Sequence, residues 1–211
     1  MRNTAAAPAL LALALLVSAV GCSDESADDA DPTTASASVT PSTPTTRGTT
    51  ATPSTIPEAS APPFTAATRA DDGGHGSGNG LGLTGVRTAQ HPGYDRVVFD
   101  LGGTGTPGWR VEYTTDPRAE GSGDPVTLKG TVFLQVILRG LGLPFDTGVA
   151  PFGDSTTRVP GTGTKGMAEI APGGVFEGEQ QAFIGLTGTK RPFRVFALAN
   201  PARVVVDVRH D

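Results

Sequence analysis

Large apolar side chains are distributed so unevenly along this chain that only part of it can build a core. Residues 23–80 contain no Leu, Met, Trp or Tyr, and their only large apolar residues are Val39, Ile56 and Phe64. Threonine, serine, alanine and proline dominate residues 33–68. Such a composition cannot bury enough apolar surface to offset the entropy lost on ordering. We therefore predict a disordered tether over residues 22–80 and one folded domain over residues 81–211.

The charged residues follow the same division. Acids outnumber bases over residues 23–80, whereas residues 81–211 carry equal numbers of each. The predicted domain has no basic excess for phosphate groups, which argues against nucleic acid as a partner. Within the tether, residues 71–80 are predicted to form a flexible hinge. A metal site at Asp71, Asp72 and His75 is the less favoured interpretation, because no further ligand cluster accompanies them.

Residues 1–21 have the pattern of an export signal. Arg2 precedes an uncharged run rich in Leu and Ala, Ala5 to Val20, which is short for a membrane-spanning helix. The run ends in Ser18-Ala19-Val20-Gly21-Cys22, which resembles a bacterial lipobox. The resemblance implies that Cys22 is lipid-modified, and that the protein is exported and anchored to the outer face of the cell membrane. The alternative is a spare thiol in a signal peptide that is cut elsewhere.

From residue 81 onward, apolar and polar residues alternate with a period of two, which is typical of β-strands. Val97, Phe99 and Leu101 share one face, and residues 131–139 are apolar on both faces, as in a central strand. Glycine and proline separate these short runs. An all-β fold follows, a β-sandwich of short antiparallel strands. Residues 166–170 fit either a strand or a helical turn, and residues 145–160 are predicted to form a long loop.

Two runs in the predicted domain repeat each other. Arg96-Val97-Val98-Phe99-Asp100-Leu101 resembles Arg203-Val204-Val205-Val206-Asp207-Val208. If the two runs are antiparallel neighbours in register, Arg96 faces Asp207, Asp100 faces Arg203, and Val98 faces Val205. Cross-strand charge pairs of this kind stabilise a sheet. The alternatives are coincidence and equivalent strands in two pseudo-symmetric halves.

Signatures of catalysis do not occur in the sequence. The three histidines, His75, His91 and His210, form no His-Glu-x-x-His spacing, and neither Gly-x-Ser-x-Gly nor a phosphate loop is found. Glu177 and Glu179 invite comparison with a glycosidase pair. Solvated surface carboxylates are the favoured interpretation, because nothing near them in the sequence would raise one pKa. We predict no catalytic residue, no metal and no cofactor.

Two groups of aromatic residues are candidates for binding. Trp109 and Tyr113 lie on one strand face and could form a glycan platform, although core packing is the favoured interpretation. The turn around Pro92 and Gly93 is predicted to expose the other group. The candidate binding residues are therefore His91, Tyr94, Asp95 and Arg96.

Four segments of the predicted domain carry a resemblance to a known family. They are residues 91–99, 107–113, 192–195 and 201–208. Together they resemble the AMIN-like domain of actinobacterial lipoproteins, which is similar to the AMIN domain of cell-envelope proteins. The resemblance implies a β-sandwich without catalysis that localises the chain in the envelope, by binding peptidoglycan or an envelope protein. An uncharacterised hydrolase is the least favoured alternative.

Overall fold

The computed structural model describes residues 61–65 and 67–210. Its only helix within these residues is α1, Pro144–Thr147. The strands are β1 (Asp71–Asp72), β2 (Gly76–Ser77), β3 (Leu81–His91), β4 (Tyr94–Gly103), β5 (Thr106–Thr114), β6 (Val132–Arg139), β7 (Val159–Pro160), β8 (Met167–Phe176), β9 (Glu179–Leu186), β10 (Phe193–Leu198) and β11 (Arg203–Arg209).

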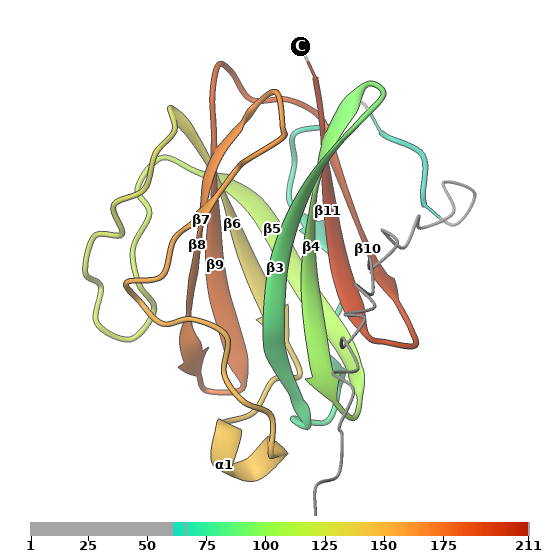
Figure 1. Cartoon of the computed structure of the whole chain (residues 1–211), viewed down its shortest axis with the longest axis vertical. Helices are drawn as coiled ribbons and strands as arrows, with labels where there is room; N and C mark the ends of the chain where they lie inside the picture. The colour runs from blue at the N-terminus through green and yellow to red at the C-terminus, as the bar shows by residue number, and fades with distance from the viewer. Residues whose placement is uncertain (1–60, 66, 211) are drawn as a thin grey trace, which may run out of the picture. The chain divides into compact units, whose positions relative to one another are not determined.

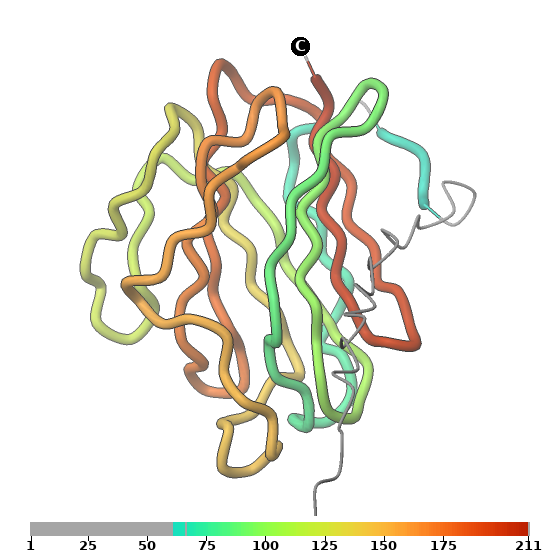
Figure 2. Tube along the Cα trace, in the orientation of Figure 1, coloured from blue at the N-terminus to red at the C-terminus, as the bar shows by residue number. Residues whose placement is uncertain are grey.

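The strands form two antiparallel sheets, which Figures 1 and 2 show from one side. One sheet has the order β1-β5-β6-β9-β8-β7, with β2 also paired to β5, and the other has the order β10-β11-β4-β3. The prediction of an all-β sandwich is confirmed. In the described part of the chain, no helix has the length and apolar character needed to cross a membrane. The predicted signal peptide, Cys22 and most of the predicted tether lie outside the described residues.

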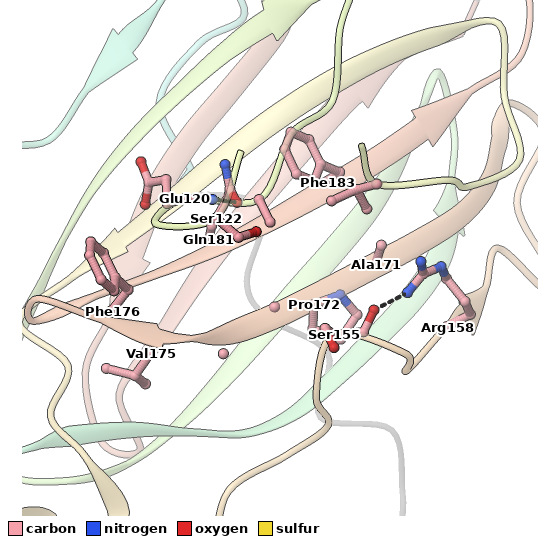
Figure 3. A pocket seen from close by; sticks show the side chains of 14 residues that line it. Glu120, Ser122, Ser155, Arg158, Ala171, Pro172, Val175, Phe176, Gln181 and Phe183 are labelled. Carbon is pink, nitrogen blue, oxygen red and sulfur yellow. Dashed lines mark hydrogen bonds between the residues drawn. The ribbon is translucent and has the colours of Figure 1, made fainter. Parts of the chain in front are cut away.

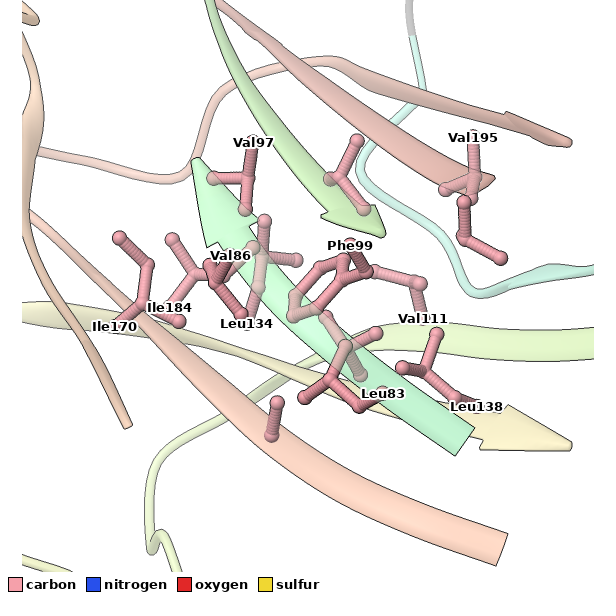
Figure 4. Close-up of a cluster of buried hydrophobic side chains, with 14 of the residues drawn as sticks. Leu83, Val86, Val97, Phe99, Val111, Leu134, Leu138, Ile170, Ile184 and Val195 are labelled. Carbon is pink, nitrogen blue, oxygen red and sulfur yellow. The ribbon is translucent and has the colours of Figure 1, made fainter. Parts of the chain in front are cut away.

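The core lies between the two sheets and is built from their alternating residues (Figure 4). Leu83 and Phe99 enter it from the four-stranded sheet, whereas Val111, Leu134 and Ile184 enter it from the larger one. Residues 131–139 were predicted to be central in a sheet, and β6 does lie between β5 and β9. The ambiguous residues 166–170 lie at the start of β8, and residues 145–160 are largely a loop between α1 and β7.

The predicted register of the two repeated runs is confirmed. β4 and β11 are antiparallel neighbours in which Arg96 lies opposite Asp207, Val98 opposite Val205 and Asp100 opposite Arg203. Of the two predicted charge pairs, Arg96–Asp207 forms an ion pair and Asp100–Arg203 does not. Arg87 on β3 binds Asp100 instead, with N–O distances of 2.6 and 2.7 Å. It can do so because β3 flanks β4 on the side opposite β11.

The flexible hinge predicted for residues 71–80 is wrong, because both halves of this segment contain a short strand that pairs with β5. Asp71 and Asp72 pair with Val111 and Arg110, and β2 pairs with the start of β5. The glycines make this pairing possible, because a Cβ on Gly73 would lie 2.1 Å from the Trp109 ring. The indole Nε1 of Trp109 also donates to Asp71 Oδ1 at 2.9 Å. Ordered structure therefore begins before residue 81.

Residues 61–65, which we call the strap, lie on the outer face of the four-stranded sheet. The part of that face beneath and beside the strap, which we call the docking face, consists of Tyr94, Arg96, Val98, Arg194, Phe196, Val205, Asp207 and Arg209. Its side chains are buried except for Arg209. An antiparallel sheet of a sandwich ordinarily turns this face to water. The tail that the composition predicts to be disordered therefore contributes to the folded domain.

Candidate binding site

The four predicted binding residues lie together at the β3–β4 hairpin, but they do not form an exposed site. His91 ends β3 and Tyr94 begins β4, on either side of a turn that Gly93 permits with a φ of 85°. The two rings stack with centroids 4.9 Å apart. Tyr94 is only 5% exposed, and the Phe64 ring of the strap lies against it at 5.5 Å. The expectation of an exposed tyrosine is therefore wrong, because the strap covers this end of the sheet.

Asp95 fixes a loop and the end of the chain to β4. Its buried carboxylate accepts hydrogen bonds from the backbone N–H of Lys165 at 3.1 Å and of Gly166 at 2.7 Å. His210 Nε2 lies 2.9 Å from the same carboxylate. Because Asp95 is occupied by three partners from distant segments, its role in the structure is to hold them together.

Arg96 is equally enclosed. Its guanidinium donates to both oxygens of Asp207 at 2.6 and 2.8 Å, and Arg194 donates to the same carboxylate at 2.8 Å. Both arginines and Asp207 are at most 7% exposed. Buried charges need such pairing to offset the loss of hydration. Tyr94, Asp95 and Arg96 thus serve the stability of the domain, and only His91 is partly exposed.

Trp109 and Tyr113 pack against the core, as the favoured interpretation predicted. The indole of Trp109 is covered by the backbone at Gly73. The hydroxyl of Tyr113 donates to Arg191 O at 2.7 Å, and its ring meets Phe193 edge to face at 5.7 Å. These two rings therefore do not form an exposed glycan platform.

A pocket of about 290 Å³ opens on the outer face of the larger sheet (Figure 3). Ala171 on β8 and Phe183 on β9 are cross-strand partners and form its floor. Gln181 fixes the loop above it, since its side chain accepts from Glu120 N and donates to Arg118 O, both at 3.0 Å. The loop before β6 and the loop before β7 therefore supply the walls.

Two further hollows lie near this pocket, and Phe176, at the tip of the β8–β9 hairpin, lines both the pocket and the larger of the two. One, of about 570 Å³, is lined by Phe176, Leu143 and Asp146. The other, of about 120 Å³, is lined by Leu143, Val149 and Phe152. Val175 borders all three hollows. We call these three hollows, which share Val175, the hairpin groove.

The large exposed apolar side chains of the described residues lie in or next to the hairpin groove: Leu143 and Phe176 line it, and Phe145 stands between the lining residues Pro144 and Asp146. Phe145 on α1 is 97% exposed, Leu143 is 54% exposed and Phe176 is 47% exposed. In Figure 1, α1 and the tip of the β8–β9 hairpin lie at the same end of the domain. Exposed apolar side chains in or next to a concave surface are common at binding sites.

Charged groups at the hairpin groove do not form a catalytic arrangement. The pKa of Glu120 is raised, mainly by burial and secondarily by the nearby carboxylate of Glu179. Glu177 lies in the hairpin turn and Glu179 is bound by Arg139 at 3.0 Å, so the two do not share a strand face. Arg158 donates to the carbonyls of Ser155, Thr157 and Thr127. Ser122 and Ser155 line the pocket, but no histidine lines it with them.

The described part of the chain holds no group of three metal-ligating side chains. Sequence reasoning did not find the hairpin groove either. Phe145 and Phe176 stand in runs that carry no periodic pattern, and an exposed phenylalanine cannot be told from a buried one by its type alone. The only pattern in the sequence around Phe145 and Phe176 is the proline and glycine residues, and these predict a loop and not a binding site.

Comparison with protein families assigns residues 81–210 to a family of all-β domains, in agreement with the fold. No curated protein and no solved structure shows significant similarity to this chain. The model of the AMIN-like domain matches residues 81–210, which include β3 to β11, the docking face and nearly all of the hairpin groove. This family is a binding-type all-β domain associated with the cell envelope. The chain belongs to the AMIN-like domain family.

Proposed function

We propose that the chain is a membrane-anchored lipoprotein of the cell envelope whose sandwich binds peptidoglycan through the hairpin groove. Family membership supports the envelope setting. The choice of surface rests on two exposed rings: Phe176 lines the hairpin groove, and Phe145 stands between the lining residues Pro144 and Asp146. Apolar ring faces of this kind stack on sugar rings, while the polar groups at the rim supply hydrogen bonds.

Sedimentation of the full chain with purified peptidoglycan, at low and high salt, tests the ligand. We expect retention at both salt concentrations, because apolar stacking is screened far less than surface charge attraction. A Phe145→Ala, Phe176→Ala double variant should bind roughly tenfold more weakly, about 1.4 kcal/mol. Lys190→Ala is the matched control, since it changes a loop at the other end of β9. Retention that the double variant does not weaken would contradict the assignment of the hairpin groove.

A second candidate function is binding of an exported protein without glycan recognition. It is favoured by the nearly complete exposure of Phe145, because isolated apolar patches of this kind commonly meet another protein surface. A photo-crosslinking residue at position 145 in living cells separates the two functions. Adducts with a protein, together with no sedimentation by peptidoglycan at either salt concentration, would replace the first proposal by the second.

The proposed anchor is a lipid on Cys22, which places the domain on the outer face of the cell membrane. The lipobox pattern and the envelope association of the family support it. One acyl chain holds a protein on a membrane only marginally, whereas two chains give stable anchoring. Cys22→Ser should leave the chain uncleaved or release it into the medium. If this variant partitions into detergent as the unchanged chain does, the anchor lies elsewhere.

A further inference from the structure

The docking face combines an apolar patch with buried charge. Val98, Phe196 and Val205 form a separate apolar cluster on the outer side of the four-stranded sheet. Beside it lie Arg96, Arg194 and Asp207, of which Asp207 is fully buried. These side chains can leave water only because something covers the sheet. The cover described in the structure is the strap.

The strap meets this face through three different kinds of contact. Ala61 packs on the apolar cluster. The carbonyl oxygen of Pro62 accepts a hydrogen bond of 2.8 Å from Arg194 Nη1. The Phe64 ring lies 4.2 Å from the guanidinium carbon of Arg194 and 5.1 Å from that of Arg209, with the Tyr94 ring at 5.5 Å.

These contacts are of the kind that recognises an extended peptide. A guanidinium that binds a backbone carbonyl recognises the peptide main chain, whatever its side chains. A pocket lined by an aromatic ring and guanidinium groups favours an aromatic side chain. The two prolines, Pro62 and Pro63, hold the segment extended before it docks, which lowers the entropy lost on binding. The strap makes no strand pairing with the sheet, so these side-chain contacts hold it.

We propose that the docking face is a peptide-binding surface for extended segments with two prolines followed by an aromatic residue. In this chain the strap is its occupant. The face lies within the residues matched by the family model, whereas the strap precedes them. A short connection joins the strap to β1, so its effective concentration at the face is on the order of millimolar. A segment of the same chemistry from another exported protein binds there only by displacing the strap.

Binding of a labelled peptide to the full chain tests this inference. The probe is the synthetic peptide Ala-Pro-Pro-Phe-Thr, which has the sequence of the strap. In the Phe64→Ala chain the strap loses its anchor, so we expect the probe to bind at least tenfold more tightly than to the unchanged chain. The matched control is Lys190→Ala, which changes an exposed side chain outside both the strap and the docking face and should leave probe binding as weak as in the unchanged chain.

A second probe, Ala-Pro-Pro-Ala-Thr, should not bind the Phe64→Ala chain. Equal binding of the two probes, or no binding of the first to a variant whose circular dichroism matches the unchanged chain, would overturn the proposal. A second measurement does not depend on whether the Phe64→Ala chain folds. It is photo-crosslinking from a benzoylphenylalanine placed at position 64. Adducts with Tyr94 or Arg209 support the docking face, and adducts confined to other segments contradict it.

Discussion

The Arg96 guanidinium on β4 and the Asp207 carboxylate on β11 form a two-point ion pair that is almost completely withdrawn from water. The two residues are also cross-strand partners, so the ion pair fixes the register of adjacent strands. Arg194 binds the same carboxylate from β10 on the other side. Asp207 thus connects three of the four strands of its sheet.

Replacing Asp207 by Asn should destabilise the domain strongly. The change leaves two buried guanidinium groups without their counter-charge, and breaking a buried ion pair in this way costs about 3–5 kcal/mol. Urea unfolding followed by circular dichroism measures the loss. Asp116→Asn is the control, because Asp116 forms an exposed pair with Arg118 and such pairs contribute about 0–1 kcal/mol. Similar losses in the two variants would show that the burial of Asp207 is not what stabilises the sheet.

Replacing Asp95 by Asn should loosen the loop before β8. The amide retains one acceptor oxygen where the carboxylate serves two backbone N–H groups and His210. Hydrogen bonds to a charged group contribute about 1.5–3 kcal/mol, so the exchange of the Lys165 and Gly166 amides should speed up markedly. Hydrogen exchange by NMR measures it. Asp100→Asn changes a partly exposed carboxylate on the same strand and should leave these two amides as protected as before.

Replacing Gly73 by Ala should displace the chain from the face of Trp109. The added Cβ would lie 2.1 Å from the indole, far inside van der Waals contact, so backbone or ring must move. Because Trp109 is the single tryptophan, its emission should shift to longer wavelength as water reaches the ring. Gly174→Ala is the control, since open space surrounds that position. An unchanged spectrum for Gly73→Ala would mean that this segment does not cover the indole.

Replacing Glu120 by Gln should make stability less dependent on pH. Burial and the carboxylate of Glu179 raise the pKa of Glu120, so the folded chain holds this proton more tightly than the unfolded chain does. Below the unfolded pKa the group is protonated in both states and has no effect. As pH rises through the folded pKa, ionisation costs the folded state more, and stability is lost.

The Glu120→Gln chain should therefore melt at a higher temperature than the unchanged chain at pH 7 and at the same temperature at pH 3. The gain is small, because the side chain is only partly buried and keeps much of its contact with solvent. Glu112→Gln should have the opposite sign at pH 7, since Glu112 pairs with Arg110. A lower melting temperature for Glu120→Gln at pH 7 would contradict the raised pKa.

Much of the fold could be predicted from local pattern. The alternation of Val97, Phe99 and Leu101 gave the core face of β4, and the repeated Arg-Val-Val motif gave the register of β4 on β11. Both predictions are confirmed because side chains alternate strictly between the two faces of a strand. The pattern of apolar residues therefore indicates which face is buried. The ion-pair partner of Asp100 could not be predicted. It is Arg87 on β3, which lies on the side of β4 opposite β11.

The site could not be predicted, for physical reasons. Whether Tyr94 is exposed depends on Phe64, which lies 30 positions earlier in a segment whose composition indicates disorder. Composition measures how much apolar surface a segment can bury by itself, not what it can bury against a surface already formed. Phe145 and Phe176 are ordinary core residues by type, yet in the folded domain both face outward.

The strap and the strands β1 and β2 also bear on how far the domain can stand from a lipid anchor. Residues 61–65 and 71–77 lie against the domain, so the proposed spacer from Cys22 would end near residue 60 instead of residue 80. An extended polyproline-type chain spans about 3.1 Å per residue, so the maximal distance from the bilayer falls by roughly 60 Å. If the proposed anchor and the proposed peptidoglycan binding hold, the groove reaches a correspondingly thinner layer of cell wall, closer to the membrane.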